Sequence, residues 1–199
     1  MGYNRRKGEM MRPIGKGDAL LVVDMQKDFI VGSLAVESAG EIILEINRLI
    51  HTFRSKKLEV WYSMDWHEEE DGSFISNGGD WPIHCVKNTD GATMHPDVYI
   101  YDNAKIIFKS QNPNVEEYSA FLTNIDGSQM DIVDVFKSAG VKRVFIVGLA
   151  IDFCVGESAK SALAEGFEVV LVRDAIRGVF VEGSKTMLGE LVYNGARIW

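Results

Sequence analysis

The chain has 199 residues, 46% of them hydrophobic, and a formal net charge of −8. This length and content favour one compact domain with one sizeable core. The acidic balance argues against a broad nucleic-acid surface, because phosphate binding depends on clustered Lys and Arg. No apolar run reaches transmembrane length, and the first residues lack the apolar core of a signal peptide. We therefore expect a cytoplasmic protein that binds a small molecule, with no membrane or nucleic-acid partner.

The first 17 residues differ in character from the rest of the chain. They are small, flexible or basic, and their cationic members are Arg5, Arg6, Lys7, Arg12 and Lys16. Such a segment could bind an acidic partner or act as an organellar address, but a solvated tail accounts for it most simply. We expect residues 1–17 to form a flexible N-terminal tail and residues 18–199 to form a single domain.

Six apolar runs then alternate with helical patterns along the chain. The runs are apolar on both alternating faces, as expected for strands that are covered on both sides, and they read "ALLVVDM", "LEVWYSM", "KIIFKS", "RVFIVGLA", "EVVLVRD" and "ARIW". Apolar residues at helical spacing indicate helices between Ile42 and Phe53, between Ile132 and Ala139, and from Val155 to Ala164. This alternation predicts a doubly wound three-layer α/β/α fold with a mostly parallel six-stranded sheet.

Four of the predicted strands end in residues that can take part in chemistry. Asp24 ends the first strand, Asp65 and His67 follow the second, Lys109 ends the third, and Cys154 lies just past the fourth. In doubly wound sheets ligands bind beyond the carboxyl ends of the strands. These residues are therefore the first candidates for a functional site.

A metal ion is one use for the residues after the second strand. Asp65 and His67 would present their side chains on one face of an extended segment, and His84 in "WPIHCV" is the natural third ligand if the long segment 68–103 folds back. Two histidines and one carboxylate can bind a divalent metal and leave positions open for water and substrate. From these residues alone, a polar loop without a metal remains the alternative.

The other polar residues nearby have simpler interpretations. His51, on a helical pattern, and His95, before a proline, are expected at the surface. The acidic run of residues 68–71 is expected to be a solvated edge, although one of its acids could hydrogen-bond a ligand histidine.

The chain has two cysteines. We expect them to have independent roles and not to form a disulfide, because we find no export signal that would direct the protein to an oxidising compartment. The stretch "VGLAIDFCVGESAKSALAEG" joins a strand to a helix by a short turn, which places Cys154 near a helix N-terminus, where thiolate is favoured. Cys154 is thus a candidate nucleophile, with a buried structural cysteine as the alternative. Cys85 has no such context and is expected to pack. If the first strand lies beside the fourth, Asp24 could accept the thiol proton and Lys109 could hold both groups electrostatically.

These residues resemble those of the isochorismatase-like cysteine hydrolases, over residues 18–199. "LLVVDMQKDF" is similar to the first-strand motif of that superfamily, and "GLAIDFCV" is similar to its nucleophile turn. "DWH", "WPIHCV" and "FKSQNPNVEEYSAF" resemble segments of its nicotinamidase branch, also called pyrazinamidases. The resemblance implies an amidohydrolase that converts nicotinamide to nicotinate and ammonia, and pyrazinamide to pyrazinoate, through a thioester in NAD salvage.

The resemblance also implies roles for individual residues. It makes Asp24 the general base, Lys109 its charged partner and Cys154 the nucleophile. It implies a cis peptide bond between Leu149 and Ala150, which would direct the N–H groups of Ala150 and Cys154 toward the substrate oxygen. It implies that Asp65, His67 and His84 are the metal ligands. It also implies that Phe29, Trp81 and Tyr118 line the pocket for the ring of the substrate.

The metal implied by the resemblance is one divalent ion, with zinc as the first choice, and the same donor set also accepts ferrous iron or manganese. One departure from the family concerns this site. Many relatives have a further histidine before a Ser-Phe pair, where this chain reads "EDGSF" with Gly72 and Ser73. We therefore expect the metal to keep an additional water, held by Ser73 or by a nearby acid.

Three other functions stay open on the sequence. A related cysteine hydrolase could act on another small amide or on a carbamoyl group. An iron oxygenase with two histidines and one carboxylate would leave Cys154 with a structural role only, and a binding protein could keep the pocket without turnover. The sequence leaves open whether the chain forms a homo-oligomer.

Overall fold

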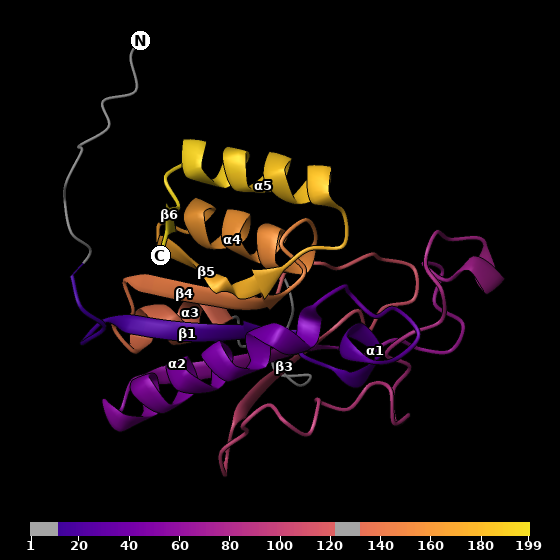
Figure 1. The fold of residues 1–199 in the computed structure, drawn as a ribbon, viewed down its shortest axis with the longest axis horizontal. Coiled ribbons are helices and arrows are strands. Elements are labelled where there is room, and N and C mark those ends of the chain that lie inside the picture. The colour runs from indigo at the N-terminus through magenta and orange to yellow at the C-terminus, as the bar shows by residue number, and fades with distance from the viewer. Residues whose placement is uncertain (1–11, 122–131) are drawn as a thin grey trace.

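The computed structural model describes residues 12–121 and 132–199, and Figure 1 shows their arrangement. Within these residues the apolar runs form a six-stranded sheet of order β3-β2-β1-β4-β5-β6, in which every neighbouring pair is parallel. The strands are β1 (Asp18–Val23), β2 (Glu59–Asp65), β3 (Lys105–Lys109), β4 (Arg143–Leu149), β5 (Glu168–Arg177) and β6 (Arg197–Ile198). The predicted α/β fold is confirmed.

Helices occupy the connections between the strands. They are α1 (Lys27–Ile30), η1 (Ala39–Ile42), α2 (Ile43–Ser55), η2 (Ile75–Asn77), α3 (Ile132–Ser138), α4 (Cys154–Ala164) and α5 (Val181–Tyr193). The sequence patterns indicate α2, α3 and α4 but not α5. Only Met187 and Leu191 of α5 are buried, and Gly183 and Gly189 lower its helix propensity, so its apolar pattern is weak.

The sheet is covered by helices on both faces (Figure 1). Alternate side chains of β1 point to opposite faces: Leu20 and Val22 belong to the same core as Ile46 of α2, and Leu21 belongs to the core that contains Val155 of α4. All residues of β1 and β4 are buried. These strands therefore read as continuous apolar runs, as expected in the centre of a parallel sheet.

The strand order reverses direction at β1, which lies between β2 and β4. Ligands of doubly wound sheets bind beside such a switch point, at the carboxyl ends of the strands. The approach of β4 to β1 depends on Gly148, which has φ +108° and whose added Cβ would lie 2.1 Å from the carbonyl oxygen of Val23. Only glycine fits there without moving the two central strands apart.

The start of the described chain is bound to the sheet. The guanidinium of Arg12 donates two hydrogen bonds to the Asp18 carboxylate at 2.6 and 3.1 Å, and Ile14 is buried. Arg143, itself buried, donates to the carbonyl groups of Arg12 and Pro13 and to Asp18. These contacts correct the expectation of a flexible tail through residue 17, and residues 1–11 of that tail lie outside the described part of the chain.

The long connection between β2 and β3 folds back over the carboxyl ends of the strands. Gln26, fully buried, fastens it there: its amide donates to the carbonyl groups of Asp65 and Ala92, and it accepts from the Asp65 N–H, each at 2.8 Å. In residues 12–121 and 132–199, no helix has the length and apolar character needed to span a bilayer.

Candidate active site

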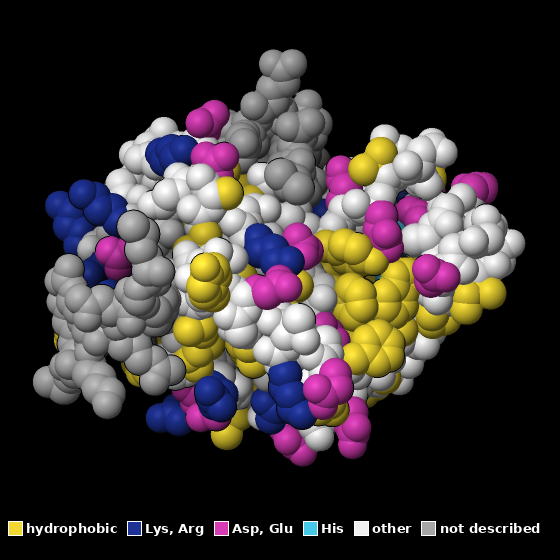
Figure 2. All heavy atoms as spheres, turned by 90° about the horizontal axis from the view of Figure 1, so that it is seen from above, with side chains coloured by type: hydrophobic (Ala, Val, Ile, Leu, Met, Phe, Trp, Pro, Cys, Tyr) yellow, Lys and Arg dark blue, Asp and Glu magenta, His cyan; other side chains and the backbone are white. Residues whose placement is uncertain are grey.

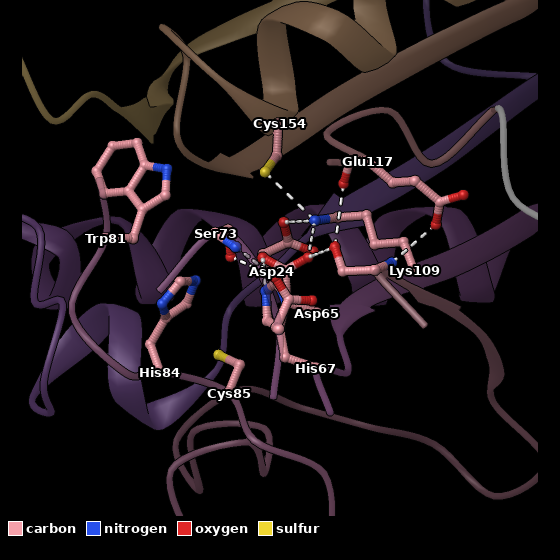
Figure 3. Close-up of polar contacts among 12 residues, drawn as sticks. Asp24, Asp65, His67, Ser73, Trp81, His84, Cys85, Lys109, Glu117 and Cys154 are labelled. Carbon is pink, nitrogen blue, oxygen red and sulfur yellow. Dashed lines mark hydrogen bonds and ion pairs between the residues drawn. The ribbon is translucent and has the colours of Figure 1, made fainter. Parts of the chain in front are cut away.

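The three residues predicted to carry the catalytic chemistry meet at the carboxyl end of the sheet (Figure 3). Asp24 directly follows β1 and has φ +50°, which turns the chain out of the strand. Its Oδ1 accepts a hydrogen bond of 2.8 Å from Ser63 of β2, and its Oδ2 lies 2.9 Å from Nζ of Lys109. Asp24 is 1% exposed, so its carboxylate interacts with these groups with little screening by water.

Lys109 is the last residue of β3 and is fully buried. Its ammonium forms ion pairs with Asp24 and Asp65, and it lies 3.3 Å from Sγ of Cys154 (Figure 3). Burial acts to lower the pKa of Lys109, but the two carboxylates outweigh it and raise that pKa well above the usual value. A permanent positive charge therefore sits between two acids and the sulfur.

Cys154 is the first residue of α4, as the turn in the sequence indicates. Its Sγ and one carboxylate oxygen each from Asp24 and Asp65 lie within 4.8 Å of one another. This group also satisfies the distance requirement for a metal site, but the Lys109 ammonium already contacts all three residues. Charge repulsion therefore argues against a cation at this point.

Burial changes the acidity of the sulfur and of the carboxylate. It raises the pKa of Cys154 well above the usual thiol value, so the resting group is a thiol. It also raises the pKa of Asp24, although Lys109 opposes that change. A carboxylate with a raised pKa is a stronger base than an ordinary carboxylate and accepts a proton more readily.

The turn that carries Cys154 contains a cis peptide bond between Leu149 and Ala150. Ala150 and Cys154 both line the same cavity. Because Cys154 begins α4, its backbone N–H is one of the donors that have no acceptor within the helix. The turn therefore brings a candidate nucleophile and a candidate donor for an anion to the same cavity.

The three predicted metal ligands also converge. Asp65 ends β2, His67 follows it, and His84 reaches the same point from the long connection, with one ligand atom of each within 4.8 Å of the others. Oδ2 of Asp65 and Nε2 of His67 are 4.0 Å apart. Two atoms that each lie about 2.1 Å from one ion are at most about 4.2 Å apart, so this spacing is compatible with a shared metal.

Hydrogen bonds fix which nitrogen each histidine offers. Nδ1 of His84 lies 2.7 Å from the carbonyl oxygen of Pro82, which can only accept, so Nδ1 carries the proton and Nε2 has the free lone pair. Nδ1 of His67 lies 2.9 Å from Oδ2 of Asp71, which leaves Nε2 free in the same way. Nε2 of His67 is buried with no hydrogen-bond partner. A buried lone pair of this kind is costly unless a ligand uses it, so the residues present fit a bound divalent metal.

Asp71 corrects the expectation that residues 68–71 form a solvated edge. It is 4% exposed, and its Oδ1 accepts from the N–H and Oγ of Ser73 at 2.8 and 2.6 Å. The alternative interpretation, in which one acid hydrogen-bonds a ligand histidine, describes its contact with His67. Burial raises the pKa of Asp71, but the bonds from His67 and Ser73 outweigh it and lower the pKa overall.

Ser110 is a site residue that the sequence patterns do not indicate. It has φ +60° and its Oγ donates to Oδ1 of Asp65 at 2.8 Å, while its N–H donates to Glu117 at 3.0 Å. Serine in a polar stretch is common, and its left-handed backbone conformation has no clear sequence signature. The position immediately after Lys109 is the only available indication.

The cavity beside the two groups is lined largely by apolar side chains. A mainly apolar lining with a few polar groups is typical of small-molecule sites. The predicted wall residues Phe29, Trp81 and Tyr118 all line it. Sequence reasoning missed four further apolar wall residues, which come from three separate segments: Leu34, Val36, Phe153 and Val179.

Aromatic rings form the outer part of this cavity. The rings of Trp81 and Tyr118 lie 5.0 and 5.6 Å from that of Phe153, and Nε1 of Trp81 donates to Glu116 at 3.3 Å. Phe180, largely exposed, packs next to Phe153. Figure 2 shows hydrophobic side chains gathered at the end of the molecule where the loops that follow the strands lie in Figure 1, with acidic side chains around them.

Two histidines and the second cysteine lie elsewhere. His51 is exposed and stacks on Tyr99, as expected for a surface residue. His95 is less exposed than predicted: it is half-buried, with 13% of its side chain exposed, and its backbone N–H donates to the carbonyl of Met25. Cys85 is buried and free, and it does not line the cavity.

The fold and the site together define a class of protein: a parallel α/β domain with a buried cysteine, carboxylate and ammonium at the carboxyl edge of its sheet, beside a candidate metal cluster. Residues 18–199 match the family model described as the isochorismatase domain. The chain belongs to the isochorismatase family.

Within this family, the chain is similar to several named enzymes and solved structures. The chain is 34% identical to the nicotinamidase of Escherichia coli (strain K12) over 180 residues, which cover 82% of this chain and 84% of that protein. It is similar to the pyrazinamidase of Pyrococcus horikoshii in complex with zinc, with a TM-score of 0.84, 40% identity, and coverage of 92% and 98%. PnC1 from L. infantum in complex with nicotinate has a TM-score of 0.84, 32% identity, and 92% coverage of both chains.

Proposed function

We propose that this chain is a metal-dependent nicotinamidase, which hydrolyses nicotinamide to nicotinate and ammonia in NAD salvage and also converts pyrazinamide to pyrazinoate. The observation that carries the proposal is the shared cavity. Cys154 and Asp24 line it, with Lys109 in contact with both, and the Asp65, His67 and His84 cluster lines it beside them. A flat ring with a carboxamide on one side and a basic nitrogen on the other matches these two groups.

The comparisons support the choice of substrate. Nicotinamidases and a pyrazinamidase match most of this chain at 30% identity or more, and one similar structure contains nicotinate. A related cysteine hydrolase that acts on a carbamoyl group is the alternative. It is the weaker one, because N-carbamoylsarcosine amidase from Thermoplasma acidophilum has a lower TM-score, 0.73, and a lower identity, 27%, than the Pyrococcus pyrazinamidase.

In the proposed reaction Asp24 first accepts the proton of the Cys154 thiol. The sulfur attacks the carboxamide carbon, and the Lys109 ammonium, 3.3 Å from Sγ, stabilises the sulfur as it becomes negative. The C–N bond of the tetrahedral intermediate then breaks, and Asp24 gives its proton to the departing nitrogen, so that ammonia leaves. The product of this half-reaction is a thioester between Cys154 and the acyl group.

The second half-reaction uses the same base. Asp24 accepts a proton from a water molecule, the resulting hydroxide attacks the thioester carbon, and the C–S bond breaks. The proton held by Asp24 returns to the thiolate, and the carboxylic acid product releases its own proton to water and leaves as the carboxylate. In both half-reactions the N–H groups of Ala150 and Cys154 donate to the oxyanion, and one such donor contributes about 3 kcal/mol to transition-state stabilisation.

The metal site supplies orientation in this proposal. Asp65, His67 and His84 would hold one divalent ion, and zinc is the proposed identity because it accepts this donor set and is present in the similar Pyrococcus structure. When bound, the ion supplies a Lewis-acidic site for the ring nitrogen of the substrate. Phe29, Trp81 and Tyr118 enclose the ring and exclude water, which brings the carboxamide toward Cys154.

The test is release of ammonia from nicotinamide by the unmutated protein, measured before and after treatment with a chelator and after addition of zinc. We expect turnover that the chelator removes and zinc restores. Pyrazinamide should also be hydrolysed, and N-carbamoyl compounds should not. The proposal would be contradicted if the zinc-loaded protein released no ammonia from nicotinamide, or if it hydrolysed N-carbamoyl compounds faster than nicotinamide.

A further inference from the structure

We propose that Asp71 is a positioning residue for the metal site, which sets the tautomer of His67 and holds its ring in place to bind the ion. This inference rests on the metal site of the proposed function. It assigns a purpose to a buried acid that neither contacts the cavity wall where Cys154 lies nor belongs to the metal cluster itself.

Both carboxylate oxygens of Asp71 are already committed to other groups. Oδ2 faces Nδ1 of His67 at 2.9 Å, and Oδ1 accepts two hydrogen bonds from Ser73, one from the backbone and one from the hydroxyl. A carboxylate that accepts on both sides has one fixed orientation. Asp71 therefore acts on the metal through His67.

The consequence for His67 follows from the two ring nitrogens. Because a carboxylate can only accept, the proton of the neutral imidazole is on Nδ1, and the lone pair is on Nε2. Nε2 is buried, has no hydrogen-bond partner, and lies 4.0 Å from Oδ2 of Asp65. The opposite tautomer would carry a proton on Nε2 and could not bind a metal there.

The segment that follows Asp71 reinforces this arrangement. Phe74, completely buried, lies with its ring 5.2 Å from that of His67 and 5.4 Å from that of His84. Asn77 donates to the backbone carbonyl of Asp71 at 2.8 Å. These contacts hold the carboxylate and the imidazole in one place before any ion binds.

The two ligand histidines differ in the group that sets their tautomer. For His84 the acceptor is the backbone carbonyl of Pro82, which remains after any substitution of that side chain. For His67 the acceptor is the Asp71 side chain, so a single substitution can reverse its tautomer. The site therefore offers a test in which one histidine changes and the other serves as an internal reference.

The decisive variant is Asp71→Asn, which keeps the shape of the side chain. The amide oxygen must face Ser73, whose backbone N–H can only donate, so the amide NH₂ faces Nδ1 of His67. Nδ1 then accepts, and the ring proton moves to Nε2. The matched control is Glu70→Gln, which removes the same charge from the exposed neighbouring residue.

Two measurements are made on each protein without any nicotinamide. Heteronuclear NMR of the metal-free protein reports the tautomer of each imidazole, and the chain has only four histidines to assign. Competition with a chromophoric chelator gives the dissociation constant for zinc. We expect Asp71→Asn to show His67 in the Nε2–H form and to bind zinc about 10- to 100-fold more weakly, with His84 and the Glu70→Gln protein unchanged.

An Asp71→Asn protein with the original His67 tautomer and zinc affinity within twofold would overturn the inference. If that variant does not fold, Ser73→Ala replaces it, since it removes one bond to Oδ1 and keeps the charge; it should weaken zinc binding by a smaller factor, and an unchanged affinity would again overturn the inference. Because neither measurement uses nicotinamide, either result is separate from the outcome of the ammonia assay.

Discussion

The two sides of the cavity are built in different ways. The side with Cys154 stands on strand ends: Asp24 follows the central strand β1, Lys109 ends the edge strand β3, and both side chains are fully or almost fully buried. The metal side takes only Asp65 from a strand end, and its histidines depend on a loop held by hydrogen bonds from Asp71 and from the Pro82 carbonyl. The first side is built on strand ends joined by buried contacts of Lys109, whereas the second depends on hydrogen bonds within a loop.

The largest effect should follow substitution of the proposed nucleophile, Cys154, on the strand side. We expect Cys154→Ala to lower the rate of nicotinamide hydrolysis by about 10⁴-fold or more, because no other thiol lines the described cavity. The variant should still bind zinc and nicotinamide, since the metal side is unchanged. Calorimetric titration and an ammonia assay measure the two properties separately.

Cys85→Ala is the control for that experiment, because it removes the other cysteine, which is buried outside the cavity. It should keep turnover within a few-fold of the parent. Ammonia release by Cys154→Ala near the parent rate would remove this residue from the mechanism and make the cysteine a structural one.

The next effect concerns the stability of the strand side. Lys109→Met leaves the Asp24 and Asp65 carboxylates buried without their shared cation. Loss of one partner from a buried ion pair typically lowers the free energy of unfolding by about 3–5 kcal/mol, and we expect a change of that size in denaturant titration.

Lys105→Met on the same strand is the matched control. Lys105 is exposed and pairs with Glu59 at 2.6 Å, a surface contact worth about 1 kcal/mol or less. Equal destabilisation by the two variants would show that the buried ion pairs of Lys109 do not stabilise the strand side.

The third prediction tests whether the metal side can be disrupted without loss of stability on the strand side. His84→Ala leaves two of the three ligands, and we expect zinc to bind at least about 100-fold more weakly, with a parallel loss of nicotinamide affinity. Elemental analysis after dialysis measures the bound metal. The unfolding free energy of the metal-free protein should change less than in Lys109→Met, because the strand side is intact.

His95→Ala provides the comparison for this variant, since that histidine lies on the same connection but outside the metal cluster. It should retain the metal content of the parent. Full zinc occupancy in His84→Ala would refute the assignment of this residue as a ligand.

The same contrast explains what the sequence could predict. Strand ends are visible as the point where an apolar run stops, and parallel strands bring their carboxyl ends to one edge, so Asp24, Lys109 and Cys154 could be placed together in advance. His84 required the further assumption that a long connection folds back. The resemblance of "WPIHCV" to a family motif supports that assumption more strongly than the spacing of His84 from Asp65 and His67 does.

The supporting residues could not be predicted because their environment depends on loop conformation. Asp71 belongs to an acidic run that has the composition of a solvated edge, and only the turn through Ser73 buries it. Gln26 and Ser110 act through hydrogen bonds to Asp65, and the sequence carries no periodic signal for such contacts. Arg12 lies in a segment whose flexible and basic composition predicts a tail, and nothing in the sequence indicates that its guanidinium binds Asp18.

The most direct test of the account is a crystal structure of the zinc-loaded protein with nicotinaldehyde, which carries a reactive carbonyl in place of the carboxamide. We predict a covalent bond from Sγ of Cys154 to the aldehyde carbon, with the ring nitrogen of the same molecule on the ion held by Asp65, His67 and His84. A ring bound with its nitrogen away from the metal, or an aldehyde out of reach of Cys154, would contradict the claim that both sides of the cavity act on one substrate.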